Sequence, residues 1–146
     1  MSNKSTFIDL ITKRRTQYAL GSDLPLAQAD VTALIQEAVR QAPSSFNSQS
    51  SRAVILFGAQ HQRFWQIVMD ELRKIVPADA FANTEKKINS FATGAGTVLF
   101  YEDQDVVAGL QKQFPLYAEN FPIWSEHSTG IAQFAVWTAL AEAKAK

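Results

Sequence analysis

Apolar side chains recur at α-helical spacing in several stretches of this chain and fill two short continuous runs between them. The clearest helical stretch covers residues 31–42 and ends before Pro43, and weaker ones cover 7–15 and 60–75. Spacing and boundary residues predict further helices over residues 79–92, 104–113 and 125–143. The chain is therefore expected to be mainly helical.

The two continuous apolar runs are residues 52–57 and 96–101, which are short and rich in β-branched and aromatic residues. Such runs are typical of strands that are buried on both faces, and Gly58 is expected to close the first one. The last helix, 125–143, is apolar around much of its circumference, as is typical of a central helix or a subunit interface. We expect a single α+β domain over residues 1–146, with helices flanking one sheet.

The overall composition excludes several classes of function. Of the 146 residues, 47% are hydrophobic, and 14 Lys and Arg balance 14 Asp and Glu, so no basic field is available to hold nucleic acid. The absence of Cys excludes disulfides, thiolate metal sites and a thiol nucleophile, and two isolated His residues make no ligand cluster. No apolar run approaches the roughly 20 residues of a membrane span. We expect a cytoplasmic protein with no nucleic-acid and no membrane partner.

A polar loop joins the helix 31–42 to the first strand, with the sequence Pro-Ser-Ser-Phe-Asn-Ser-Gln-Ser-Ser-Arg over residues 43–52. Its Ser, Asn and Gln side chains are neutral donors and acceptors, which suit a heteroaromatic ligand with a ribitol-like chain better than a proton-transfer reaction. An alternative is that Ser44 or Ser45 makes local turn bonds and that Asn47 occupies a left-handed turn position. The density of such residues favours a bound cofactor.

Arg14, Arg15 and Thr16 stand together at the end of the first helix. Two guanidinium groups and a hydroxyl could hold a phosphate through charge-assisted hydrogen bonds. The alternative is that the two cations only complement the negative end of the helix dipole. The spacing alone leaves both interpretations open.

The remaining polar residues make no convincing catalytic group. His127 precedes Ser128, but neighbouring helical positions point in different directions and no nucleophile elbow is present, which argues against a hydrolase. His61 lies between two Gln residues and is expected to face solvent. Three acidic residues near the start of the helix 104–113 are expected to cap it rather than to bind a cation: Glu102, Asp103 and Asp105.

The chain reads KRRTQYAL over residues 13–20 and APSSFNSQSSR over residues 42–52. Together these two segments resemble the nitroreductase-like FMN flavoprotein family. Residues 96–103, GTVLFYED, and 124–137, WSEHSTGIAQFAVW, resemble the subgroup related to fungal fatty-acid repression mutant proteins. The resemblance runs from about residue 6 to residue 143. It implies the nitroreductase-like fold, with a central sheet flanked by helices and a long apolar helix at a dimer interface.

The resemblance also implies a function and its residues. Members are homodimers that bind two FMN molecules at their interface, where NAD(P)H reduces the flavin and the flavin reduces nitroaromatics, quinones or similar small-molecule acceptors in alternating half-reactions. By resemblance, Arg14 and Arg15 bind the FMN phosphate, and Thr16 binds the ribityl chain or ring edge. The residues that reach the flavin from the second subunit are Ser44, Ser45, Asn47 and Gln49. Either Lys86 or Lys87 is expected to supply a positive charge near the pyrimidine edge, with Lys87 the preferred candidate.

Two departures from the family pattern affect these expectations. Tyr18 stands where many members carry a second basic residue, so one phosphate or ribityl contact is expected to be missing. Members usually continue through a further strand and a tail, so the domain is expected to lack them, as a truncated product or a reduced form that compensates by dimer packing. Besides the FMN-dependent oxidoreductase, two alternatives remain: a flavin-binding or interaction protein with little turnover, and a ligand-free helical dimerisation module.

Overall fold

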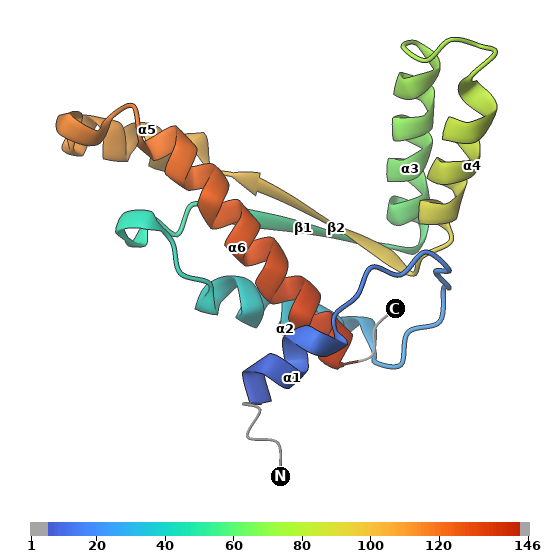
Figure 1. Ribbon diagram of the computed structural model, residues 1–146, viewed down its shortest axis with the longest axis horizontal. Coiled ribbons are helices and arrows are strands. Elements are labelled where there is room, and N and C mark those ends of the chain that lie inside the picture. The colour runs from blue at the N-terminus through green and yellow to red at the C-terminus, as the bar shows by residue number, and fades with distance from the viewer. Residues whose placement is uncertain (1–5, 144–146) are drawn as a thin grey trace.

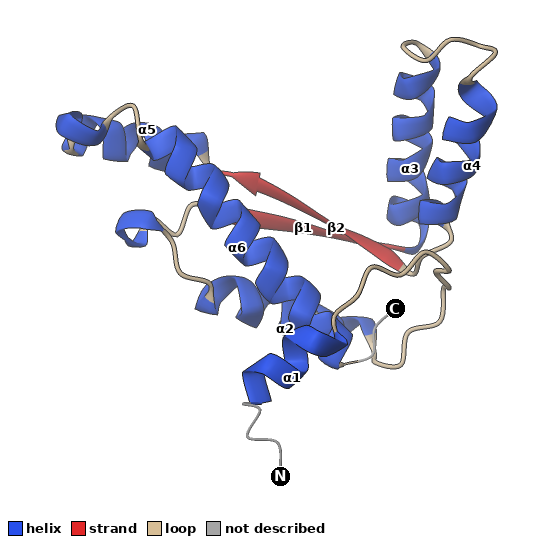
Figure 2. Cartoon of the chain, in the orientation of Figure 1, coloured by secondary structure: helices blue, strands red, loops and turns tan. Residues whose placement is uncertain are grey.

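The computed structural model describes residues 6–143, in which helices pack around a small sheet (Figures 1 and 2). The α-helices are α1 (Thr6–Lys13), α2 (Gln28–Gln41), α3 (Gly58–Arg73), α4 (Phe81–Ala92), α5 (Gln104–Gln113) and α6 (Phe121–Glu142). The strands are β1 (Ser51–Phe57) and β2 (Gly96–Glu102), and short 3₁₀ turns cover Ser45–Asn47 and Pro115–Tyr117. The predicted α+β class and both predicted strands are confirmed.

The two strands pair antiparallel along their whole length, from Ser51 opposite Glu102 to Phe57 opposite Gly96. The inner face of this sheet packs on α2 and α6. The residues of this core are Val31, Ile35, Ile55, Phe57, Val98, Phe100, Val136 and Leu140. The prediction that the strands are buried on both faces is wrong for this chain, because the described helices cover the other face only at the end next to α3. Val54, on the other face, is 40% exposed.

Helices α3 and α4 follow β1 and precede β2 along the chain. They form a hairpin that projects away from the sheet (Figure 1). The hairpin has a small core of its own around Met69, Phe81 and Ile88. Gly58 begins α3 at a φ of 53°, which a side chain would disfavour. Gly58 thus closes β1, as expected, and also begins α3.

His61 fastens the base of this hairpin to β2, so the expectation that it faces solvent is wrong. The side chain is 1% exposed, with Nδ1 2.8 Å from Oγ1 of Thr97 and Nε2 3.1 Å from the carbonyl oxygen of Ala92. Trp65 donates its indole N–H to the same Thr97 oxygen at 3.0 Å. His61 and Trp65 therefore share the one hydroxyl of Thr97.

The long last helix begins earlier than predicted, at Phe121 rather than Ser125. Pro122 lies in its first turn, where a residue without an N–H is tolerated because these N–H groups have no helical partner. One side of α6 packs against α2, the sheet and α1. The opposite side is an exposed row, hereafter the α6 stripe, of Ile123, His127, Gly130, Ile131, Phe134 and Trp137. Most of this row is apolar, which is unusual for a face open to water.

Candidate functional site

The polar loop of residues 43–52 has a strained backbone. Phe46, Asn47 and Gln49 have φ angles of 55°, 50° and 51°, in the left-handed region that favours glycine. Asn tolerates this conformation, whereas each other residue type costs roughly 1–2 kcal/mol there. Such strain persists only where the surroundings hold the chain firmly, and it is common at binding sites. The alternative that places a left-handed turn at Asn47 is thus correct, and Phe46 and Gln49 take the same conformation.

The first half of the loop is held by hydrogen bonds to itself and to α6. The Gln49 N–H donates to Oγ of Ser44 at 3.0 Å, and the Ser45 N–H donates to Oγ of Ser128 at 3.4 Å. The alternative that a serine here makes a local turn bond is thus correct for Ser44. Within residues 6–143, the side-chain amides of Asn47 and Gln49 make no hydrogen bond, so their donors and acceptors are available to a ligand.

The second half of the loop is held by a buried carboxylate. Glu102 is 8% exposed, and it accepts hydrogen bonds from the hydroxyls of Ser50 at 2.5 Å, Ser51 at 2.6 Å and Thr129. Burial raises the pKa of Glu102, but the surrounding serine and threonine hydroxyls outweigh it and hold this pKa below its usual value. The expectation that Glu102 caps α5 is wrong. Asp103 is the cap, because its carboxylate accepts the N–H of Asp105 at 3.1 Å.

The Phe46 ring, in the middle of the loop, lies among four other aromatic rings. It stacks on Trp124 with 5.8 Å between centroids and an interplanar angle of 16°. The other three rings, at 5.1 to 5.8 Å, belong to Phe114, Tyr117 and Phe121. Phe46 is nevertheless 48% exposed, so one side of this aromatic cluster is open.

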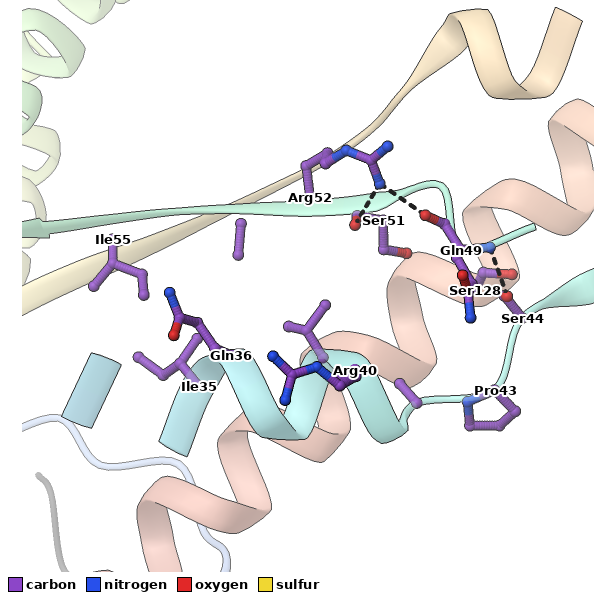
Figure 3. A pocket seen from close by; sticks show the side chains of 13 residues that line it. Ile35, Gln36, Arg40, Pro43, Ser44, Gln49, Ser51, Arg52, Ile55 and Ser128 are labelled. Atoms are coloured by element: carbon purple, nitrogen blue, oxygen red, sulfur yellow. Dashed lines mark hydrogen bonds between the residues drawn. The ribbon is translucent and has the colours of Figure 1, made fainter. Parts of the chain in front are cut away.

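A cleft of about 480 Å³ lies between α2 and β1, and the loop forms one end of it (Figure 3). Ser44 and Gln49 line this cleft from the loop, and Arg40 lines it from α2. Arg52 lines it from β1, donating to the Gln49 carbonyl oxygen at 2.7 Å and pairing with Asp103 at 3.0 Å. Ser45 and Asn47 do not line it. The cleft therefore brings together only two of the predicted site residues.

Arg14 lies on α6, far from the polar loop. Its guanidinium carbon is 4.1 Å from the ring centroid of Trp137 and 5.8 Å from that of Phe134, which is a cation–π contact. Its Nε is buried and has no hydrogen-bond partner among the described residues. Arg15 and Thr16 follow it and are exposed, and Arg15 Nη1 donates to the Arg14 carbonyl oxygen at 2.9 Å. The Arg14 side chain thus lies against two rings of α6, with a buried donor that has no partner among the described residues.

The predicted site is divided within one chain. The loop contacts α6 at Trp124 and Ser128, whereas Arg14 contacts it at Trp137. Trp124 and Trp137 are thirteen positions apart, which is about 20 Å along a helix at 1.5 Å per residue. Lys87 is exposed on α4, in the projecting hairpin, and lies near neither group (Figure 1). The eight candidate residues therefore fall into three separate places.

Sequence reasoning missed the groups that support the loop, namely Glu102, Ser128 and Thr129. A signal was present, because polar residues at 125, 128 and 129 share one face of an otherwise apolar helix. Among residues 6–143, no group of three or more His, Asp and Glu residues is placed to hold a metal ion. No helix in this part of the chain is long and apolar enough to cross a membrane.

Comparisons with known proteins agree with the expected family. The family model described as "Nitroreductase family" matches residues 11–145. Two proteins of Saccharomyces cerevisiae are similar: "Putative nitroreductase HBN1", 35% identical over 142 residues, and "nitroreductase FRM2", 36% identical over 143. Each match covers 96% of this chain and 70% of the relative. FRM2 is a fatty acid repression mutant protein, so the predicted subgroup is confirmed as well.

Solved structures support the same fold. The nitroreductase CinD of Lactococcus lactis, in complex with 4-nitrophenol, is 44% identical with a TM-score of 0.81, over 94% of this chain and 69% of that one. A more distant structure is a putative nitroreductase of Exiguobacterium sibiricum in complex with FMN. It is 12% identical with a TM-score of 0.54, over 96% of this chain and 70% of that one, and it shows the fold alone.

Proposed function

Since this chain belongs to the nitroreductase family, we propose that it is an FMN-dependent, cytoplasmic NAD(P)H oxidoreductase that reduces nitroaromatic, quinone or similar small acceptors. Oxidoreductase chemistry of the nitroreductase type follows from the family. The flavin, the donor and the acceptor class are the proposed details, and relatives bear on two of them. The CinD structure contains 4-nitrophenol, and the Exiguobacterium structure contains FMN.

The observation that carries the proposal is the state of Arg14. The guanidinium of Arg14 lies over Trp137 and donates to no other described residue, so its terminal Nη groups can bind an acceptor, and a phosphate oxygen is a natural one for them. The exposed Arg15 and Thr16 add a second charge and a hydroxyl beside it. These residues fit the phosphate and ribityl parts of FMN. Tyr18, 80% exposed, adds no charge where many family members have one, so Arg14 and Arg15 carry the phosphate contact.

The polar loop fits the other part of the flavin. The hydroxyl of Ser44 and the amides of Asn47 and Gln49 can donate to or accept from the heteroatoms of the isoalloxazine ring. Bound FMN would accept a hydride from NAD(P)H and pass electrons to the acceptor. The chain's own residues then bind and orient the flavin. Lys87 would supply positive charge near the ring, in line with the family.

The division of the site along α6 favours a homodimer in which each flavin contacts both chains. The α6 stripe runs from Ile123 to Trp137, and Gly130 is at its midpoint. If two copies of α6 cross antiparallel at Gly130, Trp137 of one chain lies level with Ile123 of the other, next to Trp124 and the loop stacked on it. Arg14 of one protomer would then approach the polar loop of its partner. The same contact would cover the apolar stripe.

Absorbance of the purified protein tests the proposal. We expect a yellow sample, or a colourless one that takes up added FMN, and bleaching of its flavin band by NADH or NADPH under anaerobic conditions. Flavin binding without bleaching would indicate a flavin-binding protein without turnover. A protein that takes up no FMN at micromolar concentration would refute the proposal and favour a ligand-free dimerisation module.

A pair of substitutions tests the assigned residues. Replacing Arg14 and Arg15 together by Ala should weaken FMN binding by about 1.5–3 kcal/mol for each charged hydrogen bond lost. The matched control is Arg63→Ala on α3, which removes a cation outside the proposed site. Unchanged FMN affinity in the double variant, measured by quenching of flavin fluorescence, would remove the phosphate assignment.

A further inference from the structure

A buried carboxylate lies behind the polar loop without being part of it. Glu102 is the last residue of β2, and hydroxyls from two elements donate to it: Ser50 and Ser51 at the end of the loop, and Thr129 on α6. Fully buried acidic residues are rare unless such donors surround them. The arrangement therefore fixes three hydroxyl groups around one charge.

The loop needs such an anchor because of its strain. Its three left-handed residues lie between two attachment points. The first attachment is the hydrogen bond from the Ser45 N–H to Ser128. The second is at Ser50, where the carbonyl oxygen accepts the Asp103 N–H at 2.9 Å and the hydroxyl donates to Glu102 at 2.5 Å. A chain segment held at both ends keeps a strained conformation that a free loop would leave.

The chemistry of the anchor is specific to a carboxylate. Oε1 accepts two hydroxyls, from Ser51 and Thr129, while Oε2 accepts the third, from Ser50. All three donors point at acceptors, which an ionised carboxylate alone provides on both oxygens. An amide at position 102 would present N–H groups to one of these hydroxyls. Hydrogen bonds to a charged acceptor are also stronger than those between neutral groups.

We propose that Glu102 is the positioning residue of the flavin-binding loop. Through Ser50 and Ser51 it holds the loop residues 44–49 in their ligand-binding conformation, and through Thr129 it fixes that conformation relative to α6. This inference rests on the proposed function for its ligand. Its effect on the loop itself can be measured without one.

The test combines two substitutions at Glu102 with a change in its partners. Glu102→Gln keeps the size of the side chain, and Glu102→Ala removes the acceptors; the Gln variant serves if the Ala variant does not fold. Each is made in the natural background and in a Ser50→Ala, Ser51→Ala background. Asp105→Asn is the matched control, because it neutralises a carboxylate on the exposed start of α5.

The first readout is amide hydrogen exchange of peptides covering residues 44–50, in the absence of flavin. Glu102→Gln should raise exchange there about tenfold while leaving α4 and the Asp105→Asn control unchanged. The second readout is FMN affinity, which should fall about tenfold in the same variant. In the Ser50→Ala, Ser51→Ala background, Glu102→Gln should lower FMN affinity by less than about threefold, because the hydrogen bonds from the loop to Glu102 are already absent.

The outcomes separate this inference from the proposed function. If the natural protein binds no FMN, the proposed function fails, and the exchange measurement still decides whether Glu102 holds the loop. If FMN binds but Glu102→Gln leaves both loop exchange and affinity unchanged, the inference is wrong. The inference is also wrong if the loss of FMN affinity in the triple variant equals the product of the losses from Glu102→Gln and from the two serine substitutions. Glu102 would then act on general stability and not through the loop.

Discussion

Gly130 offers a direct test of the proposed dimer. It lies in the centre of the α6 stripe, and a Cβ added there would meet no atom within 4 Å. Gly130→Ala should therefore fit the isolated chain and stabilise it by up to about 1 kcal/mol, because glycine is a poor helix former. Gly130→Arg should also fit the isolated chain, since its side chain has open space to enter.

The same Gly130→Arg change should disrupt a pair of crossing helices. A side chain forced into a packed contact costs about 1–3 kcal/mol. In a two-fold symmetric dimer this cost occurs twice, because each chain contributes one such side chain. The total of about 2–6 kcal/mol should raise the dissociation constant of the dimer by a factor between about 30 and more than 10⁴. An unpaired Arg charge buried in the contact adds to this.

Sedimentation velocity over a range of concentrations measures the dissociation constant, and far-UV circular dichroism verifies the fold. The matched control is Gly109→Arg on α5, where an added Cβ likewise meets no atom within 4 Å. We expect Gly109→Arg to dimerise like the natural chain. A Gly130→Arg variant that keeps the natural dissociation constant, or a natural chain that is monomeric at all concentrations, would refute the crossing at α6.

Three further predictions concern stability. Gln49→Gly should raise the free energy of unfolding by about 0.5–1 kcal/mol by removing left-handed strain, while weakening FMN binding; a loss of stability in urea titrations would contradict it. Because the pKa of Glu102 is lowered in the folded state, its charge stabilises the protein at neutral pH, and this contribution disappears as pH falls through that lowered value. The Glu102→Gln variant should thus be less stable than the natural chain at pH 7, and the difference in stability should disappear in acid. Equal thermal midpoints at pH 7 would count against this. Thr97→Val should cost about 2–4 kcal/mol by leaving His61 and Trp65 without their shared hydroxyl, whereas Thr97→Ser should recover most of it.

The local parts of this fold could be predicted from the sequence. The spacing of Val31 and Ile35 within one helix, and the continuous run that ends at Phe57, depend on neighbours a few residues away. Both elements form where expected. The errors of prediction lie at the boundaries of elements. One example is Pro122, which lies inside the first turn of α6 although a proline usually interrupts a helix.

The connections between distant residues could not be predicted in the same way. Glu102 reads as a helix cap because it stands next to Asp103 and Asp105, yet its donors come from positions 50, 51 and 129. His61 resembles a surface residue because it lies between two glutamines, yet Thr97 of β2 meets it at the base of the hairpin. One sequence shows which residues can donate and accept, but only the folded chain determines which of them meet.

Helix α6 connects the candidate site to the exposed apolar surface. The same helix carries Trp124, on which the loop stacks, Trp137, on which Arg14 lies, and the open stripe between them. In the proposed dimer, a second α6 covers this stripe and brings Arg14 and the loop to the same ligand. Ligand binding should then be linked to association, because a ligand that binds only the dimer stabilises it by mass action. In the proposed dimer, the apolar stripe is thus the surface that brings Arg14 of one protomer to the polar loop of its partner.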